Sequence, residues 1–470
     1  MNAAPGTLVR GRHVLTSASP EVLADGAVRI VGERIADVGP YAELAARYPA
    51  DRVSGGPRDI VTPGFVNTHG HFSEALIAGM GEEYALGDWI RELIAPVAPH
   101  LGPEAAYVGT LLAGVQLLRT GVTLTGDMFV CDPAADGPPV TPGVVRALDE
   151  LGLRGVVAFG AGDRRPGVTV AGVLREHEAL RRAAGASRLS RFRVGITVLA
   201  AQSPELFART VRLAVDGGHG VHVHLHEVRD EVRAARAEHG VSPVEYCARH
   251  GLFEAPTLAA HCVWSDERDI ALLAGHGVAV AHNPVANMVL ASGVCPVGDL
   301  RRAGVEVGLG VDGAASNDRQ DMLEVIKSAV LLQRVHRLST AALSARDALR
   351  MATLGGARAL GLGDELGSLE PGKSADLVVF DGDSPALANV HDPFQSVVYC
   401  AGPREVRDVW VAGRRSVAGG GVTGVPVPEV VERSRELAAD LVRRAGLDRL
   451  RHPAVAPAVP AAPEPVGGAA

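Results

Sequence analysis

The chain lacks an excess of positive charge. Its 46 lysines and arginines are outnumbered by 54 aspartates and glutamates, so the net charge at pH 7 is -8. A protein that binds the nucleic-acid backbone needs a basic surface that displaces counterions. The composition therefore argues against nucleic acid as a partner. Nearly all of the positive charge is arginine, because only two lysines occur, Lys327 and Lys373.

Paired cysteines and long apolar runs are also missing. The five cysteines are odd in number, scattered, and never spaced as Cys-x-x-Cys, which is typical of reduced thiols in a cytoplasmic protein. No apolar run reaches the roughly 18 residues that a membrane-spanning helix needs. The first residues show no basic segment followed by an apolar one, as an export signal would. We therefore expect a cytoplasmic protein without a membrane partner.

Histidines at the ends of apolar runs are the most informative feature that is present. His69 and His71 follow the run Phe65-Val66-Asn67-Thr68. Alternate residues of a strand point to the same face, so two imidazoles two positions apart at a strand end can hold one metal ion. An isolated pair of this kind is more often a surface or core feature. The rest of the chain must decide between these readings.

Three later segments repeat the pattern of a hydrophobic run that ends in a polar residue. They are residues 221–227 with His222, His224, His226 and Glu227, residues 259–262 with His261, and residues 305–318 with Asp312. Buried strands with reactive residues at their carboxyl ends are typical of a parallel barrel. Helical segments such as 103–119 and 321–335 alternate with these runs, as in βα units. The pattern predicts an α/β fold, a (β/α)8 TIM-like barrel.

With these motifs the chain resembles the metal-dependent amidohydrolase superfamily, in its cytosine deaminase-like branch. The segments His282-Asn283-Pro284-Val285-Ala286-Asn287-Met288 and Asp312-Gly313-Ala314-Ala315-Ser316-Asn317 are close to the methylthioadenosine/S-adenosylhomocysteine deaminases. Triazine hydrolases and 8-oxoguanine deaminases share much of the pattern, which covers residues 5 to 445. The resemblance implies an aminohydrolase (deaminase) that releases ammonia from a purine base or purine nucleoside derivative, by attack of metal-bound hydroxide. Two alternatives stay open: a hydrolase that removes chloride or an alkylamine from a triazine or pterin-like ring, and a non-catalytic binding protein of the same fold.

The resemblance also implies how the domains are arranged. Both chain ends are rich in short strands, and in the resembled family they form one small β-sandwich beside the barrel. The expected boundaries are 1–60 and 369–426 for the two parts of the sandwich and 61–368 for the barrel. A C-terminal helix over 427–450 and a disordered Pro/Ala-rich tail over 451–470 would follow.

The resemblance assigns roles to the clustered residues. His69, His71, His224 and Asp312 are the expected metal ligands; His222 is the competing ligand, and His224 is preferred because Glu227 follows it by three positions, as in this branch. Glu227 would protonate the ring nitrogen, Asp312 would take the proton of the water, and His261 would polarise the oxygen or hold the hydroxide. The alternatives are a solvated strand-end carboxylate for Glu227 and a core histidine for His261.

The scarcity of lysine bears on the number of metal ions. Binuclear members of the superfamily bridge two metals with a carboxylated lysine from a middle strand, and no lysine lies between His71 and His224. We therefore expect one divalent ion, Zn2+ or Fe2+. A bridging glutamate or cysteine is not excluded by this argument.

The substrate-binding residues follow from the resemblance alone. Trp89 would cover the ligand, Arg154 would lie near the pocket, and Ser316 and His261 would also contact the substrate; Ser316 could instead cap a helix or order its loop. The related deaminases hold ribose hydroxyls with a glutamate where this chain has Ala98. We therefore expect a heterocyclic small molecule without a free ribose diol at that place. Homo-oligomers are common in the family.

Overall fold

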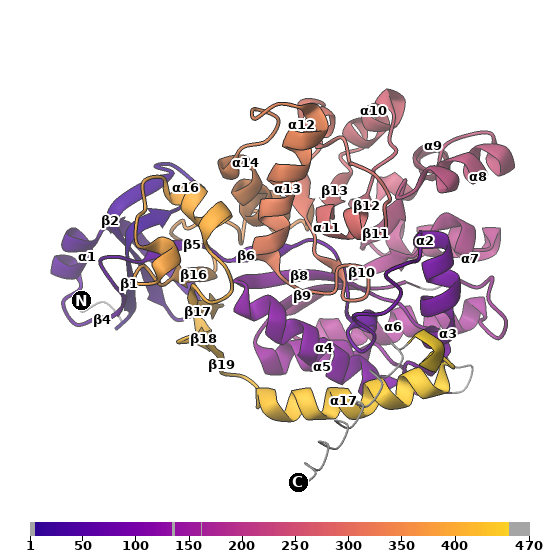
Figure 1. The fold of residues 1–470 in the computed structure, drawn as a ribbon, viewed down its shortest axis with the longest axis horizontal. Coiled ribbons are helices and arrows are strands. Elements are labelled where there is room, and N and C mark those ends of the chain that lie inside the picture. Colours follow the sequence, from indigo (N-terminus) through magenta and orange to yellow (C-terminus); the bar gives the residue numbers. More distant parts are fainter. Residues whose placement is uncertain (1–4, 134–136, 161, 451–470) are drawn as a thin grey trace, which may run out of the picture.

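The computed structural model describes residues 5–133, 137–160 and 162–450. The tail expected over 451–470 lies outside the described residues. Within them, eight parallel strands form the central sheet of the molecule (Figure 1). In sheet order they are β14 (Val307–Leu309), β13 (Ala279–His282), β12 (Thr257–His261), β11 (Gly220–Leu225), β10 (Ser190–Ile196), β9 (Arg154–Phe159), β8 (Val122–Phe129) and β6 (Phe65–Asn67).

The two edges of this sheet meet. The backbone N–H of Thr68 donates to the carbonyl of Leu309 at 2.9 Å. Just beyond, β7 (Gly70–His71) pairs in parallel with β15 (Asp312–Gly313). The sheet is therefore closed into a barrel, which confirms the predicted fold class. Closure also brings the first histidine motif beside Asp312.

Burial explains why these segments form strands of a barrel. Every residue of β8 and of β12 is buried, as expected for parallel strands that are covered on both faces. The helices that cover the barrel are α4 (Pro103–Arg119), α5 (Pro142–Leu151), α6 (Val170–Ala186), α7 (Pro204–Val215), α8 (Arg229–His239), α9 (Pro243–Arg249), α10 (Glu267–Gly275), α11 (Pro284–Val289), α12 (Val297–Arg302), α13 (Met322–Arg337), α14 (Ala345–Arg350) and α15 (Gly356–Ala359).

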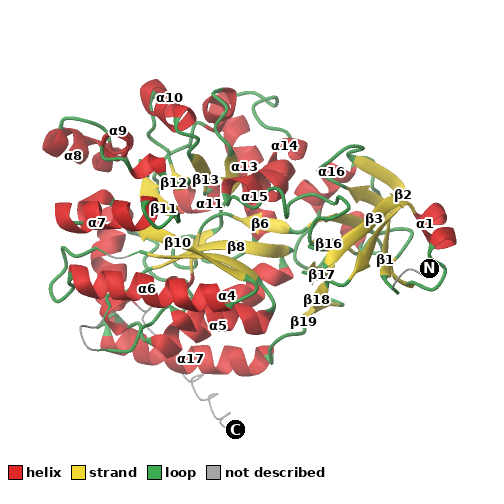
Figure 2. Cartoon of the chain, turned by 180° about the vertical axis from the view of Figure 1, so that it is seen from behind, coloured by secondary structure: helices red, strands yellow, loops and turns green. Residues whose placement is uncertain are grey.

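A second sheet joins the two β-rich ends of the chain (Figure 2). Its strands are β19 (Gly421–Val422), β18 (Arg414–Ala418), β17 (Val406–Val411), β16 (Leu377–Phe380), β5 (Ile60–Pro63), β1 (Thr7–Leu15), β2 (Val22–Val31) and β3 (Arg34–Pro40), with β4 (Arg52–Gly55) paired to β1. The ends meet where β5 lies antiparallel to β16. Val9, Val28, Val61 and Val379 contribute to one buried core. The small β-domain built from both ends is confirmed.

Short helices complete the architecture. They are α1 (Tyr41–Arg47), α2 (Leu86–Trp89), α3 (Ala95–Val97) and α16 (Pro393–Gln395). The longer α17 (Val427–Arg444) lies along α4 (Figure 1), where Arg433 Nε donates to Glu104 Oε1 at 3.0 Å. Among the described residues, no helix has the length and apolar character needed to cross a bilayer.

Candidate active site

A cavity of about 170 Å³ opens at the carboxyl ends of the barrel strands. The residues lining it are His71, Ser73, Glu74, Leu86, Trp89, Ile90, Ile94, Val130, Cys131, Asp132, Gly162, Arg165, Thr197, Val198, Ala201, His224, Glu227, His261, Leu290, Asp312 and Ser316. Strand ends far apart in sequence therefore contribute to one pocket. This is the end of a parallel barrel at which reactive residues gather.

Four of the predicted ligands converge at the bottom of this cavity. His69 Nε2 lies 3.2 Å from Asp312 Oδ1, and His71 Nε2 lies 3.5 Å from the same oxygen. The Nε2 atoms of His71 and His224 are 3.1 Å apart. Three imidazole nitrogens and one carboxylate oxygen are the ligand types that Zn²⁺ binds. The buried Nε2 of His69 has no hydrogen-bond partner among the described residues, so the donor set fits one divalent metal ion.

Neighbouring groups orient two of these imidazoles. His71 Nδ1 donates to the carbonyl of Met128 at 2.7 Å, which leaves the lone pair of Nε2 available to a metal. His69 Nδ1 lies 2.8 Å from His222 Nε2. His222 thus sits behind His69, whereas the ring of His224 reaches the cavity. Of the two competing histidines, His224 lies beside His71 at the cavity, and its role as the ligand stays a prediction.

Burial keeps the cluster in the protonation states that a metal requires. It lowers the pKa of His71 to about 4 and the pKa of His224 well below its ordinary value. Both rings are therefore neutral near pH 7, the form in which histidine binds metals. For Asp312 burial acts in the opposite direction, but the surrounding histidines outweigh it and hold the pKa below its usual range.

His261, the last residue of β12, and Glu227, two residues after β11, lie close together beside the ligand cluster. His261 Nε2 lies 3.6 Å from Glu227 Oε2 and 3.8 Å from Asp312 Oδ2. The amide nitrogens of Asn283 and Asn287 face His261 Nδ1 at 3.3 and 3.0 Å. Nδ1 therefore accepts, and Nε2 carries the hydrogen that points toward the two carboxylates. Burial raises the pKa of Glu227 well above its ordinary value, and the nearby Asp312 adds to this effect.

The backbone is strained at two of these strand ends. His261 has φ 73° and Asp312 has φ 66°, both in the left-handed region that non-glycine residues rarely occupy. Such conformations cost on the order of 1–3 kcal/mol and persist where the surrounding structure enforces them. Here they turn both side chains into the same cavity at the point where β12 ends and β15 begins.

Two of the remaining predicted residues line the cavity. Trp89 closes one wall and donates from Nε1 to the carbonyl of Ala315 at 3.2 Å. The hydroxyl of Ser316 donates to the carbonyl of Gly313 at 3.2 Å, so it orders its own loop. It does not cap the following helix, because Asp321 accepts from the first N–H groups of α13.

Arg154 is the exception, because the prediction that it lies near the pocket is wrong. It begins β9, at the opposite end of the strand from the cavity. Its Nε donates to Asp376 Oδ2 at 3.0 Å and its Nη2 donates to Ser374 Oγ at 2.7 Å. Its guanidinium is therefore committed to the junction between the barrel and the small β-domain.

A further carboxyl group, which was not predicted, lies beside the ligands. Glu74 lines the cavity and accepts from the backbone N–H of Ala315 at 3.1 Å. A Cβ added to Gly313 would lie 1.8 Å from Glu74 Oε2, so a larger residue at 313 would displace the Glu74 carboxyl from its present position. Burial raises the pKa of Glu74 well above its ordinary value. A signal was present, because Glu74 follows His71 by three positions, as Glu227 follows His224.

Three polar residues on the outer wall were missed as well. Asp132, Arg165 and Thr197 line the cavity in the segments that follow β8, β9 and β10. The rule that polar residues at the end of a buried strand mark a site would have selected Asp132, which follows Val130 and Cys131. The same rule applies to Thr197, which comes directly after β10.

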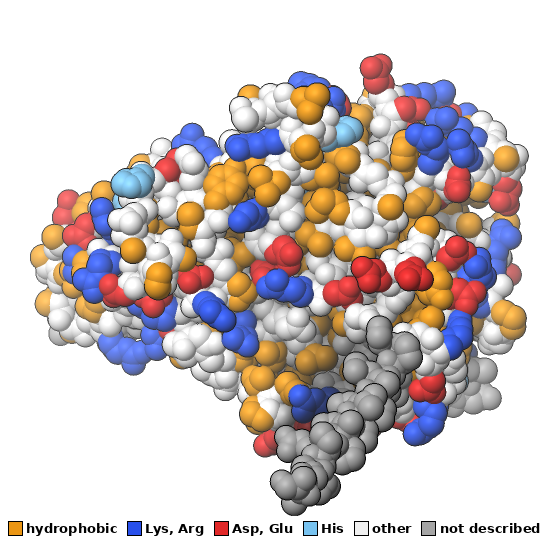
Figure 3. Space-filling view, viewed as in Figure 1, with side chains coloured by type: hydrophobic (Ala, Val, Ile, Leu, Met, Phe, Trp, Pro, Cys, Tyr) orange, Lys and Arg blue, Asp and Glu red, His pale blue; other side chains and the backbone are white. Residues whose placement is uncertain are grey.

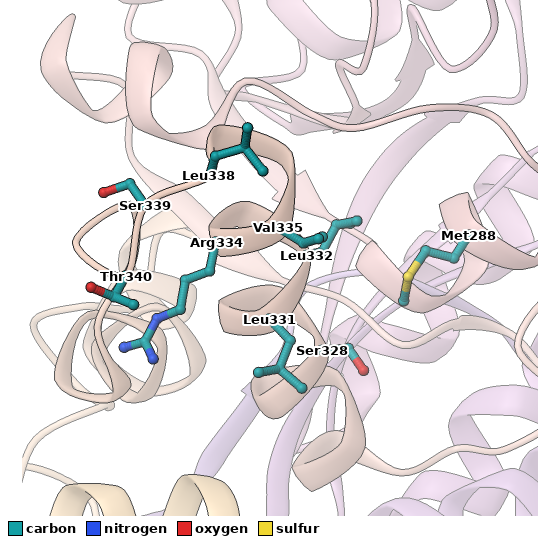
Figure 4. A pocket seen from close by; sticks show the side chains of 9 residues that line it. All are labelled: Met288, Ser328, Leu331, Leu332, Arg334, Val335, Leu338, Ser339 and Thr340. Carbon is teal, nitrogen blue, oxygen red and sulfur yellow. The ribbon is translucent and has the colours of Figure 1, made fainter.

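A larger hollow of about 640 Å³ lies on the outer surface beside α13 (Figure 4). Its lining includes Met288, Leu331, Val335 and Leu338, all exposed, and Arg334 is its only ionisable residue. Figure 3 shows hydrophobic side chains gathered on this face of the molecule. Among the described residues that line it, the hollow has no pair of acid and base groups, and the predicted reactive residues line the smaller cavity instead.

Comparison with known proteins agrees with this geometry. The model of the Amidohydrolase family matches residues 60–415, and that of an imidazolonepropionase-like composite domain of bacteria matches residues 26–50. A 5-methylthioadenosine/S-adenosylhomocysteine deaminase of Pelotomaculum thermopropionicum is 37% identical over 443 residues, which cover 93% of this chain and 99% of the relative. A 5'-deoxyadenosine deaminase of Methanopyrus kandleri is 36% identical over 392 residues, which cover 83% and 89%.

The solved structures give the same result. An adenosine deaminase of Xanthomonas campestris with bound zinc superposes with a TM-score of 0.86 at 30% identity, covering 93% of this chain and 99% of that one. The likeness extends over the barrel and the small β-domain together.

Proposed function

Because the chain belongs to the amidohydrolase family, we propose that it is a metal-dependent aminohydrolase that releases ammonia from a purine base or purine nucleoside derivative. The observation that carries the proposal is the group formed by Glu227, His261 and Asp312 against the ligand cluster. The names of the relatives, which are deaminases of adenosine derivatives, support the same reaction.

One divalent ion, zinc, fits between His69, His71, His224 and Asp312, and when bound it supplies a Lewis acid that lowers the pKa of a water molecule. The protein's own residues supply the proton transfers. Asp312 Oδ2, on the side of His261, accepts the proton of the attacking water. His261 donates from Nε2 to the oxygen that adds to the ring.

Glu227 delivers a proton to the ring nitrogen beside the carbon under attack. That nitrogen must be protonated as the carbon becomes tetrahedral, and burial, by raising the pKa of the Glu227 carboxyl, favours the form that carries the required proton. The amino group takes the proton held by Asp312 and leaves as ammonia. The added hydroxyl gives its proton back to Glu227 as the ring carbonyl forms, so both carboxyl groups return to their starting states. Trp89, Leu86 and Ile90 form an apolar wall that suits a flat heterocycle.

A screen for ammonia release tests this function. The metal-replete protein is incubated with purines, purine nucleosides, pterins and amino- or chlorotriazines. We expect ammonia from a purine-type compound, in equal amount to the hydroxylated ring product. Chloride or alkylamine release from a triazine, without ammonia from any purine, would assign the chain to the alternative hydrolase reaction. No turnover of any compound by fully loaded protein would favour a binding protein.

The proposal also covers the partners, the cellular location, the oligomeric state and the domain boundaries of the protein. The partner is a heterocyclic small molecule, and we propose no nucleic-acid or membrane partner, a cytoplasmic location and a homo-oligomer. The proposed domains keep the boundaries 1–60 with 369–426, 61–368 and 427–450. Light scattering coupled to size-exclusion chromatography tests the oligomeric state, and a monomer at micromolar concentration would contradict it.

A further inference from the structure

The cavity has two chemically different ends. The metal ligands, Glu227 and His261 occupy its floor, and the reaction proposed above uses all of them. At the outer wall, Asp132 and Arg165 form a charged pair, and the proposed reaction does not use either residue. Arg165 Nη1 lies 3.3 Å from Asp132 Oδ1. A charged pair that lines a substrate cavity and takes no part in the chemistry is a candidate for recognition of the substrate.

This pair is held in place by the segment that contains Ala98. The backbone N–H of Asp132 donates to the carbonyl of Ala98 at 3.1 Å. Arg165 Nη2 donates to the carbonyl of Ala95 at 2.5 Å. These hydrogen bonds connect three chain segments into one wall of the cavity. The segments follow α2, β8 and β9. Position 98 lacks a carboxylate, but the residue whose backbone contacts it, Asp132, carries one and lines the cavity.

The burial of the pair suits binding of a polar ligand. The side chain of Asp132 is 14% exposed and that of Arg165 is 30% exposed. Burial raises the pKa of Asp132, and Arg165 opposes this only in part. A carboxylate that has lost water and is incompletely compensated gains from further hydrogen-bond donors. Hydroxyl groups of a ligand are such donors, and Arg165 can donate to their oxygens.

The walls between the two ends separate a flat ring from a polar substituent. Leu86, Ile90 and Ile94 are apolar cavity residues, and Ile94 directly precedes Ala95, whose carbonyl accepts from Arg165. A heterocycle whose reacting carbon faces Glu227 would lie against this apolar side. Any substituent on the far edge of the ring would then reach Asp132 and Arg165. The hydroxyl groups of a sugar match the hydrogen-bonding capacity of that pair.

We propose that Asp132 and Arg165 form a specificity subsite for the sugar hydroxyls of the substrate, and that the substrate is a purine nucleoside. The inference rests on the proposed deaminase function and goes further by naming the substrate class. It departs from the sequence-based expectation at Ala98, which favoured a substrate without a ribose diol. Asp132 accepts hydrogen bonds from the hydroxyl groups, and Arg165 holds the carboxylate toward the cavity.

The test compares three substrates in wild type and in Asp132→Ala: adenosine, its dideoxy analogue without the two ring hydroxyls of the sugar, and free adenine. We expect wild type to prefer adenosine to the dideoxy analogue by about 10–100-fold in kcat/KM, the range for a hydrogen bond to a charged group. Asp132→Ala should lose the same factor with adenosine and should leave the dideoxy analogue and adenine unchanged. Asp132→Asn should retain part of the preference.

Asp88→Asn is the matched control, because Asp88 lies on α2 beside the cavity, does not line it, and pairs only with exposed Arg91 among the described contacts. It should leave all three substrates unchanged. Metal content and melting temperature identify a variant that has failed to fold, and the wild-type comparison needs no variant. Equal kcat/KM for adenosine and its dideoxy analogue would overturn the inference, as would an equal loss with all substrates in Asp132→Ala. Absence of ammonia from every purine would instead refute the proposed function itself.

Discussion

The carboxyl of Glu227 is buried 3.6 Å from His261 Nε2 and faces the cavity floor. Glu227→Gln keeps the size of the side chain but removes its ability to exchange a proton. We expect turnover to fall by about 10²–10⁴-fold, the usual contribution of a general acid or base. Metal content and melting temperature should stay close to wild type. Glu205→Gln, an exposed change on α7, is the control, and near-normal turnover of Glu227→Gln would assign the proton transfer to another group.

The ligand cluster predicts close to one metal ion per chain. His69→Ala and His224→Ala each remove one of three imidazoles and should abolish tight binding, measured by metal analysis after desalting. His222→Gln should retain the stoichiometry at saturating zinc but weaken affinity by about 10–100-fold, because His222 only supports His69. Two ions per chain in wild type, or full loading of His224→Ala, would contradict this assignment.

For single residues, the sequence indicates an expected set of metal ligands. It does not indicate the residues that form the outer wall of the cavity. His69, His71, His224 and Asp312 each end a buried run, and strand periodicity alone brings such residues to one end of a barrel. Asp132 follows a run as well, but it lies beyond the end of β8, where strand periodicity no longer determines the position of a side chain. Its contact with Ala98 depends on how two loops pack, which periodicity does not determine.

Helix α6 carries a buried histidine that makes stability depend on pH. Both ring nitrogens of His177 lack hydrogen-bond partners among the described residues, and the ring lies 5.4 Å from that of Phe159. Burial lowers its pKa from 6.5 to about 4. Between these values the unfolded chain binds the proton and the folded chain does not. Stability is therefore fully present above pH 6.5 and declines by about 3 kcal/mol as the pH falls to about 4.

His177→Phe should remove this loss, because a third aromatic ring replaces the titrating group between Phe159 and Phe192. Urea unfolding of both proteins at pH 7 and near pH 4.5, at the same zinc concentration, measures the difference. The free energy of unfolding of the variant should fall less with acid than that of wild type. Parallel losses in the two proteins would show that His177 is protonated in the folded state.

Among the helices and strands, the barrel strands could be predicted from the sequence. The backbone conformation at the ends of these strands could not. The buried runs that form β11 and β12 are continuous and apolar apart from their histidines, so their place in a parallel sheet follows from pattern. The left-handed turns at His261 and Asp312 do not follow from the sequence, because aspartate and histidine adopt this conformation more often than most residues but still only occasionally. Arg154 shows the opposite error, since the start of a strand was mistaken for a pocket wall.

Across the whole molecule, Arg154 joins the barrel to the small β-domain. Arg154→Met would leave the buried carboxylate of Asp376 without its cation, at a cost of about 3 kcal/mol in unfolding free energy. Urea unfolding should show this loss, while kcat and KM should stay unchanged because the side chain lies away from the cavity. Arg154→Lys should restore part of the stability. A raised KM without loss of stability would return Arg154 to the substrate role that the sequence suggested.

The pairing of β5 with β16 sets the order in which the protein can be completed during synthesis. Ile60 lies opposite Phe380, and the roughly 320 residues between them take on the order of half a minute to leave the ribosome. Throughout that time the nascent chain presents an unpaired strand edge, the kind of surface that seeds aggregation. Barrel strand β14 emerges before β16, so the barrel can close before the small β-domain is complete. Chaperones that shield strand edges would therefore act on the first 63 residues, long before the enzyme is finished.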